Sequence, residues 1–409
     1  MNGPASQAEE SPGRHRDAWL EIDLAAIAHN VAALRTTLKP GVAVAPVVKA
    51  NAYGHGLAAV AGSLDGQADA LCVATLDEAL ELRRAGIRGP VVILYPIPAT
   101  GLPEAVRARL ELTVMDEGDA RALAVAMARL SGKLEGQETP RVGVHVAVDT
   151  GMARGGLPPE RVETAARALL AVPGVSLAGL WTHLVSPGDV TRSRAQVDDF
   201  ERAARFLANA GADVPPRHIC ASGGIFAGTA PDLEMVRPGL VVYGVSDADL
   251  PIAPHRAAAA AALRPAMSLK ARAVAFTDVP VGGTVGYGGR WQAARASRVA
   301  ILPLGYADGF ARQSEPGSEA LIRDRRAPLV GVISMDALAV DVTDLPGVDG
   351  RDEFVLLGQT GDERITAVDL ARTRNTIPWD VLSGMAARLA RVYYPPAGIG
   401  EPDTNPGLP

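Results

Sequence analysis

Lysine is scarce in this chain, and one lysine stands where it could take part in covalent chemistry. Four of the 40 basic residues are lysines, and Lys49 directly follows the apolar run VAVAPVV (42–48). A lysine at the carboxyl end of a buried strand is expected to have a lowered pKa and to be able to form a Schiff base with an aldehyde. The ANAYGHG segment (50–56) then indicates a tight turn that brings a ligand close to the backbone. The alternative is a strand-end lysine that only reaches solvent.

Two later loops contain glycine at positions that could hold a phosphate group. ASGG (221–224) follows one apolar run, and Tyr243-Gly244 ends the next. Loops of this kind commonly bind phosphate in barrel enzymes, although either loop alone is equally consistent with an ordinary turn. Together with Lys49, the two loops predict a cofactor that carries both an aldehyde and a phosphate, namely pyridoxal 5'-phosphate.

The elements that would position these residues form a regular series. Eight short apolar runs alternate with segments of helical periodicity over residues 17–255, which predicts a (β/α)8 TIM-like barrel in an α/β protein. An open, doubly wound sheet is the alternative, because the number of strands does not show whether the sheet closes. The eight runs are residues 42–48, 70–74, 90–94, 110–115, 142–148, 175–181, 217–221 and 235–244.

The pattern changes after residue 255. A proline-bracketed helix over 251–265 is expected to lead into a C-terminal mostly-β domain, residues 256–395, where alternating apolar runs are separated by Gly-Gly, Pro-Gly and Asp-Gly turns. Residues 1–16 and 396–409 are polar or rich in proline and glycine, and they are predicted to be disordered tails.

Composition excludes several classes of protein. Hydrophobic residues make up 48% and charged residues 21%, which argues against a disordered or mostly membrane-embedded chain. A net charge of −6 gives no reason to expect nucleic acid or an anionic membrane as a partner. Two cysteines cannot form a disulfide framework, no histidine pattern suggests a metal site, and the polar N-terminus does not resemble a secretory signal. A cytoplasmic protein without a metal is therefore expected.

The order and spacing of several motifs resemble the alanine racemase family, whose members are fold-type III pyridoxal phosphate enzymes. VVKANAYGHG (47–56) resembles the lysine motif of that family, and the resemblance extends from Trp19 to Tyr393. It implies an N-terminal barrel, a C-terminal β domain and a homodimer whose active sites are shared between the subunits. The other matching motifs are DTGMAR (149–154), WTHL (181–184), VRPG (236–239), VGYGGRW (285–291), PLGYADG (303–309), SMD (334–336) and RVY (391–393).

The resemblance also implies a role for individual residues. Racemisation needs proton exchange on both faces of a planar carbanion, which two acid/base groups on opposite sides can supply. Lys49 would hold the cofactor and act as one of these groups, and Tyr287 of the partner subunit would be the other. Arg237 would face the pyridine nitrogen with His183 beside it. An arginine there leaves this nitrogen largely unprotonated, which argues against a decarboxylase.

The remaining roles implied by the resemblance concern binding. Arg154, with the backbone N–H of Met335 of the partner subunit, would hold the substrate carboxylate, and Tyr306 would line the entrance. The residues that would bind the cofactor, apart from Lys49 and Arg237, are Tyr53, Ser222, Gly239 and Tyr243 with Gly244.

Three positions depart from the family pattern. Ala147 stands where a lysine that can be carbamylated is usual, Ala221 replaces an asparagine, and Trp379 replaces a tyrosine. We expect an isomerase that interconverts L- and D-alanine for D-alanine biosynthesis, with substrate choice affected by these departures. The alternatives are a racemase for another amino acid in specialised metabolism, a fold-type III decarboxylase, or a non-catalytic pyridoxal phosphate-binding protein. The last resembles the barrel alone, so the C-terminal motifs count against it.

Overall fold

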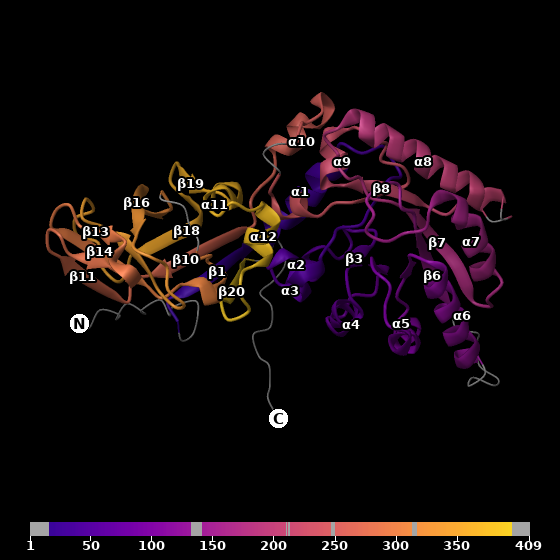
Figure 1. Cartoon of the computed structure of the whole chain (residues 1–409), viewed down its shortest axis with the longest axis horizontal. Coiled ribbons are helices and arrows are strands. Elements are labelled where there is room, and N and C mark those ends of the chain that lie inside the picture. Colours follow the sequence, from indigo (N-terminus) through magenta and orange to yellow (C-terminus); the bar gives the residue numbers. More distant parts are fainter. Residues whose placement is uncertain are drawn as a thin grey trace, which may run out of the picture. The chain divides into compact units, whose positions relative to one another are not determined.

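The chain forms two compact units. The computed structural model describes residues 16–131, 141–209, 211, 213–246, 250–312 and 317–394. Ala25–Arg264 form one unit, which we call the barrel unit. The chain up to Leu24 and from Pro265 onward forms the other, which we call the β unit. Each unit is described by itself below (Figure 1).

Eight parallel strands make up the centre of the barrel unit. The six-stranded sheet has the order β2-β9-β8-β7-β6-β5, and β3 pairs with β4. Parallel bridges from Val47 to Cys72 and from Val92 to Glu111 join the two sheets at both ends, so the strands close into a barrel. The strands are β2 (Ala43–Val44), β3 (Leu71–Val73), β4 (Val91–Ile93), β5 (Leu112–Val114), β6 (Val142–Ala147), β7 (Val175–Trp181), β8 (Arg217–Ala221) and β9 (Met235–Arg237). All eight predicted barrel strands are present, although the last run, 235–244, is a strand only over Met235–Arg237 and continues as a short 3-10 helix over Leu240–Tyr243. The open-sheet alternative is excluded.

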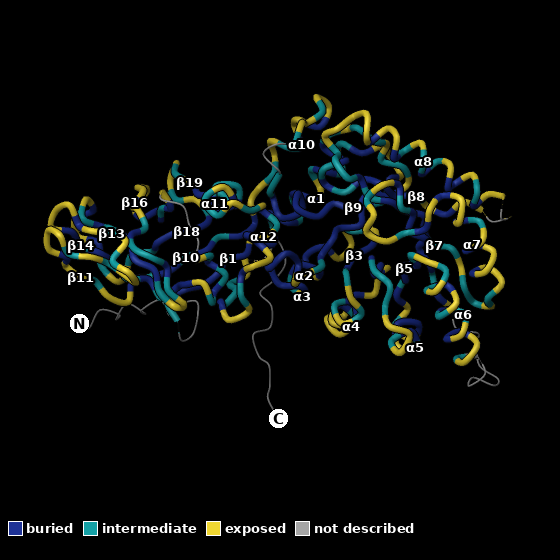
Figure 2. The backbone as a smooth tube through the Cα atoms, in the orientation of Figure 1, coloured by how far each residue is buried: buried dark blue, intermediate teal, exposed yellow. Residues whose placement is uncertain are grey.

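Helices lie outside the barrel strands, as Figure 1 shows for α4 to α8. The helices of this part of the chain are α1 (Leu24–Arg35), α2 (Lys49–Tyr53), α3 (Leu57–Ser63), α4 (Leu76–Arg84), α5 (Leu102–Arg107), α6 (Glu117–Ser131), α7 (Val162–Leu170), α8 (Val190–Asn209), α9 (Ser222–Ala227) and α10 (Ala257–Ala261). Helix α4 begins with a capping box, because Thr75 and Glu78 bond each other's backbone N–H groups. Figure 2 shows exposed and buried positions alternating along α4 and α7, whereas the strands between them are buried.

A ten-stranded sheet dominates the β unit. Its order is β11-β14-β17-β16-β15-β18-β10-β1-β20, and β19 pairs with β18. The strands are β1 (Ala18–Asp23), β10 (Met267–Arg272), β11 (Ala275–Val279), β14 (Ser297–Leu302), β15 (Glu319–Ile322), β16 (Arg325–Val330), β17 (Leu338–Asp341), β18 (Glu353–Thr360), β19 (Glu363–Ile365) and β20 (Ala390–Tyr394). A small hairpin, β12 (Thr284–Val285) with β13 (Trp291–Gln292), and helices α11 (Ala367–Thr373) and α12 (Pro378–Ser383) complete the described part. The expected mostly-β domain is confirmed.

The boundaries of the units differ from the predicted 17–255 and 256–395. Strand β1 lies between β10 and β20 in the ten-stranded sheet, so the first strand that the structure describes belongs to the β unit. At the other boundary, buried Arg256 pairs with Asp232 and donates to the carbonyl oxygen of Thr37, which ties the following helix α10 to the barrel unit. Strand pairing over such sequence separations leaves no local signal, which is why the sequence placed residues 17–24 in the barrel.

The tail predictions fall almost entirely outside the described residues. Arg16 is the exception, because it is described and bonded to Asp308 rather than disordered. Among the helices that the structure describes, none combines the length and the apolar character needed to span a bilayer.

Candidate active site

The predicted site residues of the barrel unit gather at the carboxyl ends of its strands, where barrel enzymes bind substrates. Lys49 opens α2, which begins five residues after the end of β2, and Ser222 opens α9 directly after β8. Arg237 is the last residue of β9, and His183 follows β7 by two residues. The strand order therefore brings together side chains that are almost 200 residues apart in the sequence.

The turn after Lys49 has an unusual backbone. Ala50, Asn51, Ala52 and Tyr53 all have φ values between 52° and 54°, in the left-handed region that costs a residue with a Cβ roughly 1–2 kcal/mol. The surroundings hold this turn in place. Glu78 accepts from the backbone N–H of Ala50 at 2.7 Å, and the Asn51 side chain accepts from Leu57 at 2.8 Å. A strained backbone that neighbouring residues stabilise in this way is typical of a functional site.

The electrostatics around Lys49 disfavour its charged form and favour an anionic ligand. Burial lowers the pKa of Lys49, and the charge of Arg154 lowers it further, whereas Glu78 acts in the opposite direction. Burial together with Arg237, Arg154 and Lys49 lowers the pKa of His183 to about 3. The charges of Arg237 and Arg154, together with Lys49, thus act on one histidine. Such a concentration of positive charge is suited to a ligand that carries a phosphate or a carboxylate.

Ser222, Gly239 and Tyr53 form a compact cradle next to this cluster. The Oγ atom of Ser222 accepts from the N–H of Gly239 at 2.9 Å and from that of Val241 at 3.4 Å. A Cβ atom at position 239 would lie 2.7 Å from the hydroxyl of Tyr53, so only glycine fits there. Burial raises the pKa of Tyr53 to about 12, which keeps its hydroxyl protonated and able to donate. Two hydroxyl groups and a glycine at the end of the barrel fit a phosphate group.

Tyr243 is placed differently from its predicted role as a phosphate ligand. Its hydroxyl donates to the carbonyl oxygen of Val47 at 2.9 Å, and its side chain is completely buried. Its ring stacks against Tyr53 and His55, with ring centres 4.9 and 4.4 Å away. The N–H of Gly244 is likewise bonded, to the carbonyl oxygen of Val241. Tyr243 therefore supports Tyr53 and the lysine turn, because its hydroxyl hydrogen is already committed.

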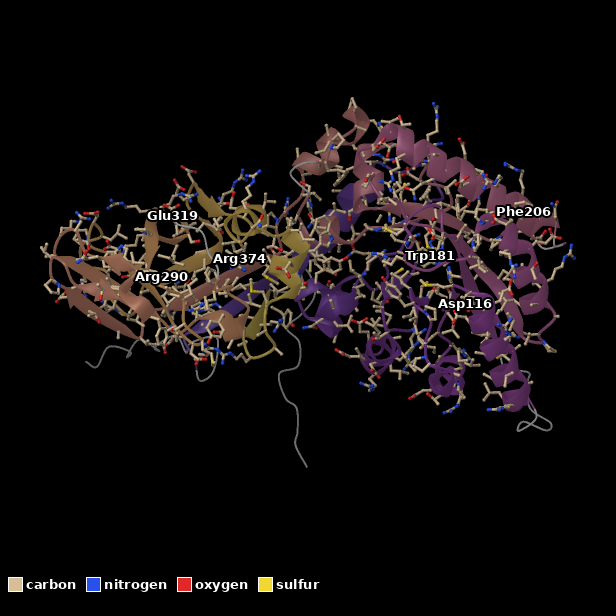
Figure 3. The ribbon with its side chains drawn as sticks, in the orientation of Figure 1. Asp116, Trp181, Phe206, Arg290, Glu319 and Arg374 are labelled. Carbon is tan, nitrogen blue, oxygen red and sulfur yellow. The ribbon has the colours of Figure 1, made fainter. Side chains whose placement is uncertain are left out.

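Arg237 is fixed by a histidine that the sequence analysis did not select. Its guanidinium bonds the ring nitrogen Nδ1 of His218 and donates to the carbonyl oxygens of His218 at 2.9 Å and Thr182 at 2.8 Å. The histidine hydrogen-bonded to Arg237 is His218, and His183, predicted to lie beside Arg237, is within its electrostatic reach. The guanidinium also lies over the ring of Trp181, 4.9 Å from its centre. Trp181 is seen among the barrel strands in Figure 3.

Gln196 is a second residue that the sequence analysis missed. It is buried on α8, and its amide donates to the Thr150 hydroxyl at 3.0 Å and to the carbonyl oxygen of His183 at 3.0 Å. It also accepts from the N–H of Val185 at 2.9 Å. One side chain thereby joins the DTGMAR loop, which carries Arg154, to the WTHL loop. A polar residue in an otherwise ordinary amphipathic helix gives no signal of this role.

Tyr287, Tyr306 and Met335 belong to the β unit. Tyr287 is 71% exposed and lines an open, mostly apolar cavity of about 400 Å³, with Ser334 and Ala337 among the other lining residues. Met335 is 52% exposed and Tyr306 40% exposed. The N–H of Tyr306 donates to the carbonyl oxygen of Ser334 at 3.0 Å, so the loops that carry Tyr306 and Met335 lie side by side.

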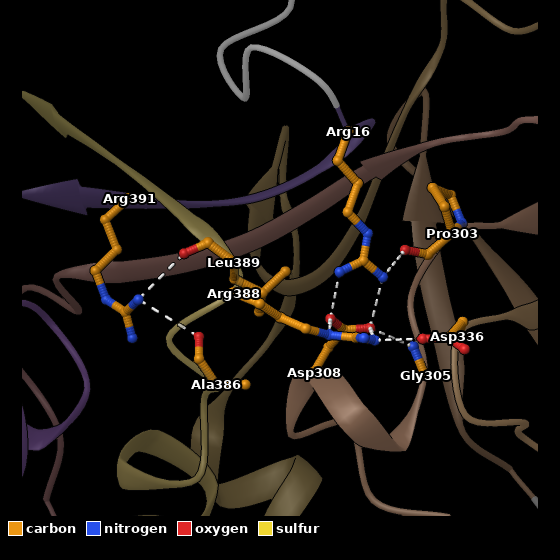
Figure 4. A network of polar contacts seen from close by, with 9 residues as sticks. All are labelled: Arg16, Pro303, Gly305, Asp308, Asp336, Ala386, Arg388, Leu389 and Arg391. Carbon is orange, nitrogen blue, oxygen red and sulfur yellow. Dashed lines mark hydrogen bonds and ion pairs between the residues drawn. The ribbon is translucent and has the colours of Figure 1, made fainter.

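A buried carboxylate holds these two loops together (Figure 4). Asp308 is completely buried, and it is bonded by both Arg16 and Arg388 and by the N–H of Gly305. The guanidinium of Arg388 also donates to the carboxylate of Asp336, next to Met335, at 2.7 Å. Arg16 donates to the carbonyl oxygen of Pro303 at 2.6 Å. Hydrogen bonds from both arginines outweigh the effect of burial, which alone would raise the pKa, and hold the pKa of Asp308 below its usual value.

The three departures from the family pattern have different surroundings. Ala147 is 3% exposed and lies directly opposite Trp181 in the register of β6 and β7. Ala221 ends β8 immediately before Ser222, and Trp379 is half-buried in α12 of the β unit. Trp181 therefore occupies space next to the position where the family has a lysine. No group of three or more His, Cys, Asp or Glu residues in the described ranges is arranged to hold a metal ion.

A closed parallel barrel with a half-buried lysine in a cationic cluster at its carboxyl end defines a barrel enzyme for small anionic ligands. Comparison with known proteins gives the family. Residues 22–247 match the family described as alanine racemase, N-terminal domain, and residues 266–393 match alanine racemase, C-terminal domain. The chain therefore belongs to the alanine racemase family, whose members depend on pyridoxal 5'-phosphate.

Individual relatives agree with this assignment. An alanine racemase from Desulfosudis oleivorans is 36% identical over 391 residues, which cover 92% of this chain and 96% of the relative. One from Symbiobacterium thermophilum is 38% identical over 384 residues, 92% of this chain and 97% of the relative. The solved structure of an alanine racemase from Clostridium difficile 630 is similar with a TM-score of 0.84 at 29% identity, covering 92% of this chain and 96% of that one.

Proposed function

We propose that this protein interconverts L- and D-alanine with pyridoxal 5'-phosphate as its cofactor. The observation that carries the proposal is the cluster of Lys49, Arg154, His183 and Arg237 at the carboxyl end of the barrel, next to the cradle of Ser222 and Gly239. A lysine with a lowered pKa suits an aldehyde, and the cradle and the cations suit a phosphate and a carboxylate. A decarboxylase is disfavoured, because a buried arginine rather than an acid would face the pyridine nitrogen.

Each residue of the site would have its own role in racemisation. When bound, the cofactor supplies delocalisation for the electron pair that remains after the α-proton leaves. Lys49 would hold the cofactor covalently and move a proton at Nζ on one face of the substrate. Arg154 would orient the substrate carboxylate, Ser222 and Tyr53 would donate to the phosphate, and Arg237 would donate to the pyridine nitrogen. A carboxylate anchored in this way favours loss of the α-proton over loss of carbon dioxide.

We further propose a homodimer in which Tyr287 of the partner subunit moves the proton on the opposite face. The support is that Lys49 and Tyr287 lie on different units, and that Tyr287 and Met335 are large side chains left exposed on the β unit. Two chains related by a twofold axis would make two equivalent composite sites. Met335 would then contribute its backbone N–H to the carboxylate and Tyr306 would line the entrance. A cytoplasmic location fits Cys72 and Cys220, both free thiols in the structure.

Two experiments test these proposals. Purified protein with pyridoxal 5'-phosphate is incubated with each L-amino acid, and the D-product is measured by chiral chromatography. Turnover of alanine above all other substrates is expected, and a strong preference for another amino acid would overturn the substrate assignment. Every amino acid is tested because the departures at Ala147 and Trp379 are expected to affect substrate choice.

The dimer is tested by complementation. Lys49→Ala and Tyr287→Phe homodimers should each be nearly inactive. Equal mixing under exchange conditions gives half heterodimers, each with one intact site, so about a quarter of the wild-type activity should return. Two distinguishable affinity tags confirm that heterodimers form. If they form and activity does not return, Tyr287 does not act across the interface.

A further inference from the structure

A line of four bonded side chains runs from Arg237 to the edge of the barrel. Arg237 bonds Nδ1 of His218, Nε2 of His218 lies 3.0 Å from Nδ1 of His145, and Nε2 of His145 lies 2.8 Å from the carboxylate of Glu111. The side chains of both histidines are at most 1% exposed, whereas that of Glu111 is 29% exposed. The buried guanidinium is therefore connected through two buried imidazoles to a carboxylate near the surface.

The two ends of this line determine where every proton lies. An arginine can only donate, so Nδ1 of His218 must accept and its Nε2 must carry the hydrogen. That hydrogen points to Nδ1 of His145, which must accept, so Nε2 of His145 carries the hydrogen that Glu111 accepts. An ionised carboxylate only accepts, which makes this the one consistent arrangement. Burial and the charge of Arg237 lower the pKa of His218 well below its usual value, in agreement with a neutral ring.

The barrel is built to allow this contact. The four residues come from β9, β8, β6 and the residue before β5, so the two histidines must meet across β7, which separates their strands. Strands two apart in a sheet are separated by roughly 10 Å. Gly179 of β7 lies beneath the contact, and a Cβ atom there would be 2.1 Å from Nδ1 of His145 and 2.8 Å from Nε2 of His218. The register of β6 and β7 also shifts next to His145, and that of β8 and β9 shifts between His218 and Ala221.

We propose that Glu111 and His145 are positioning residues that act through His218 to hold the Arg237 guanidinium in one orientation as a donor. The role of Arg237 toward the cofactor rests on the proposed function, whereas the arrangement of protons does not. Without His145, the Nε2 hydrogen of His218 would be buried without an acceptor, and the ring would reorient away from Arg237. With an amide in place of Glu111, the line could also run in the reverse direction, which would set an N–H of His218 against Arg237.

The proton arrangement is tested directly by nitrogen NMR of histidine-labelled protein. Both His145 and His218 should show an unprotonated Nδ1 and a protonated Nε2 at pH 8, with assignments from the loss of each signal on substitution. A charged ring or the opposite tautomer at either residue would overturn the proposal. The measurement does not depend on activity, so it applies even if the substrate assignment fails.

Three variants test the effect on the site. His145→Phe removes the acceptor, Gly179→Ala separates the two rings while keeping both histidines, and Glu111→Gln removes the charge at the partly exposed end. In the first two, kcat for alanine should fall about 10- to 100-fold with KM changed less than about threefold, because Arg154 still holds the carboxylate. The visible absorbance band of the bound cofactor should shift in the same variants. Glu111→Gln should lower kcat about tenfold and populate a second His218 tautomer.

The matched control is Glu163→Gln, a carboxylate-to-amide change in an exposed helical pair with Arg167. It should leave the spectrum, kcat and histidine signals unchanged. Far-ultraviolet circular dichroism shows which variants are folded, and Glu111→Gln carries the test if the buried variants are not. If the wild type racemises alanine and Glu111→Gln behaves like the control in all measurements, the proposal is wrong. If the wild type does not racemise alanine, the proposed function fails, and the NMR result decides this inference alone.

Discussion

Replacement of Asp308 by asparagine should destabilise the β unit and loosen the loops that carry Tyr306 and Met335. The carboxylate accepts five hydrogen bonds, two from Arg16, two from Arg388 and one from the N–H of Gly305. An asparagine has a single acceptor oxygen, so it loses the two or three bonds made by the other oxygen. It also turns an N–H group toward the arginines, where donor faces donor.

The magnitude follows from the burial of this carboxylate. Breaking a buried ion pair by removing one partner costs about 3–5 kcal/mol. The side chain of Asp308 is fully buried, but those of Arg16 and Arg388 are 28% and 40% exposed and can be rehydrated. The expected loss in the free energy of unfolding is therefore at the lower end, about 3 kcal/mol, which corresponds to a fall in Tm of about 6–12 °C for a unit of this size.

Urea and thermal unfolding of the full-length protein measure this loss, with Asp349→Asn as the control. Asp349 pairs with Arg351 on the surface, so its replacement should leave the midpoint within error. The pKa of Asp308 is lowered in the folded state, so its contribution is present above about pH 4 and disappears as the pH falls and the carboxylate is protonated. The curves of wild type and Asp308→Asn should converge in acid. Equal stability at pH 7 would refute the reasoning.

Two further predictions concern the barrel unit. Lys49→Ala should abolish the visible absorbance of the bound cofactor, and borohydride reduction of the wild-type holoenzyme should label the peptide with Lys49; labelling of Lys39, Lys133 or Lys270 would contradict the site. Ala147→Lys should change KM for alanine if Arg154 gains an orienting partner, and it should lower stability by about 1–3 kcal/mol, because Ala147 is buried against Trp181. Unchanged KM and kcat would show that Arg154 is already held by other residues.

The sequence predicts the barrel well because its evidence is local. Each apolar run contains a strand, as VGVHVAV (142–148) contains β6, and a helix such as α4 begins at its own capping box. Closure and pairing are not local, however. Strand β1 joins β10 and β20 across more than 240 residues, and nothing in AWLEID (18–23) indicates those partners. The observed unit boundaries therefore differ from the predicted domain boundaries, whereas the fold class is as predicted.

Among the site residues too, those with a local signal are predicted from the sequence, and those whose role depends on distant partners are not. Lys49 was found because an ionisable residue at the end of an apolar run is conspicuous, and Ser222 and Gly239 were found through motifs. His218 lies inside an apolar run that predicts only a strand. A histidine in a buried strand is itself a signal, however, because a buried imidazole requires partners. His145 is likewise a buried histidine in an apolar run, on β6, which is separated from β8 by β7. The hydroxyl of Tyr243 donates to the carbonyl oxygen of Val47, an orientation that a motif does not show.

These differences have one physical cause. The positions that the sequence identifies are those whose chemistry conflicts with their local surroundings, such as a lysine in an apolar run. The positions that it missed resolve such conflicts from a distance: Glu78 holds the strained turn beside Lys49, His218 binds the guanidinium of Arg237, and Gly179 leaves room for two imidazoles. A buried charge or a strained turn persists only where such partners stabilise it. Each conspicuous residue in the sequence therefore implies supporting residues, and the order of the strands determines which ones they are.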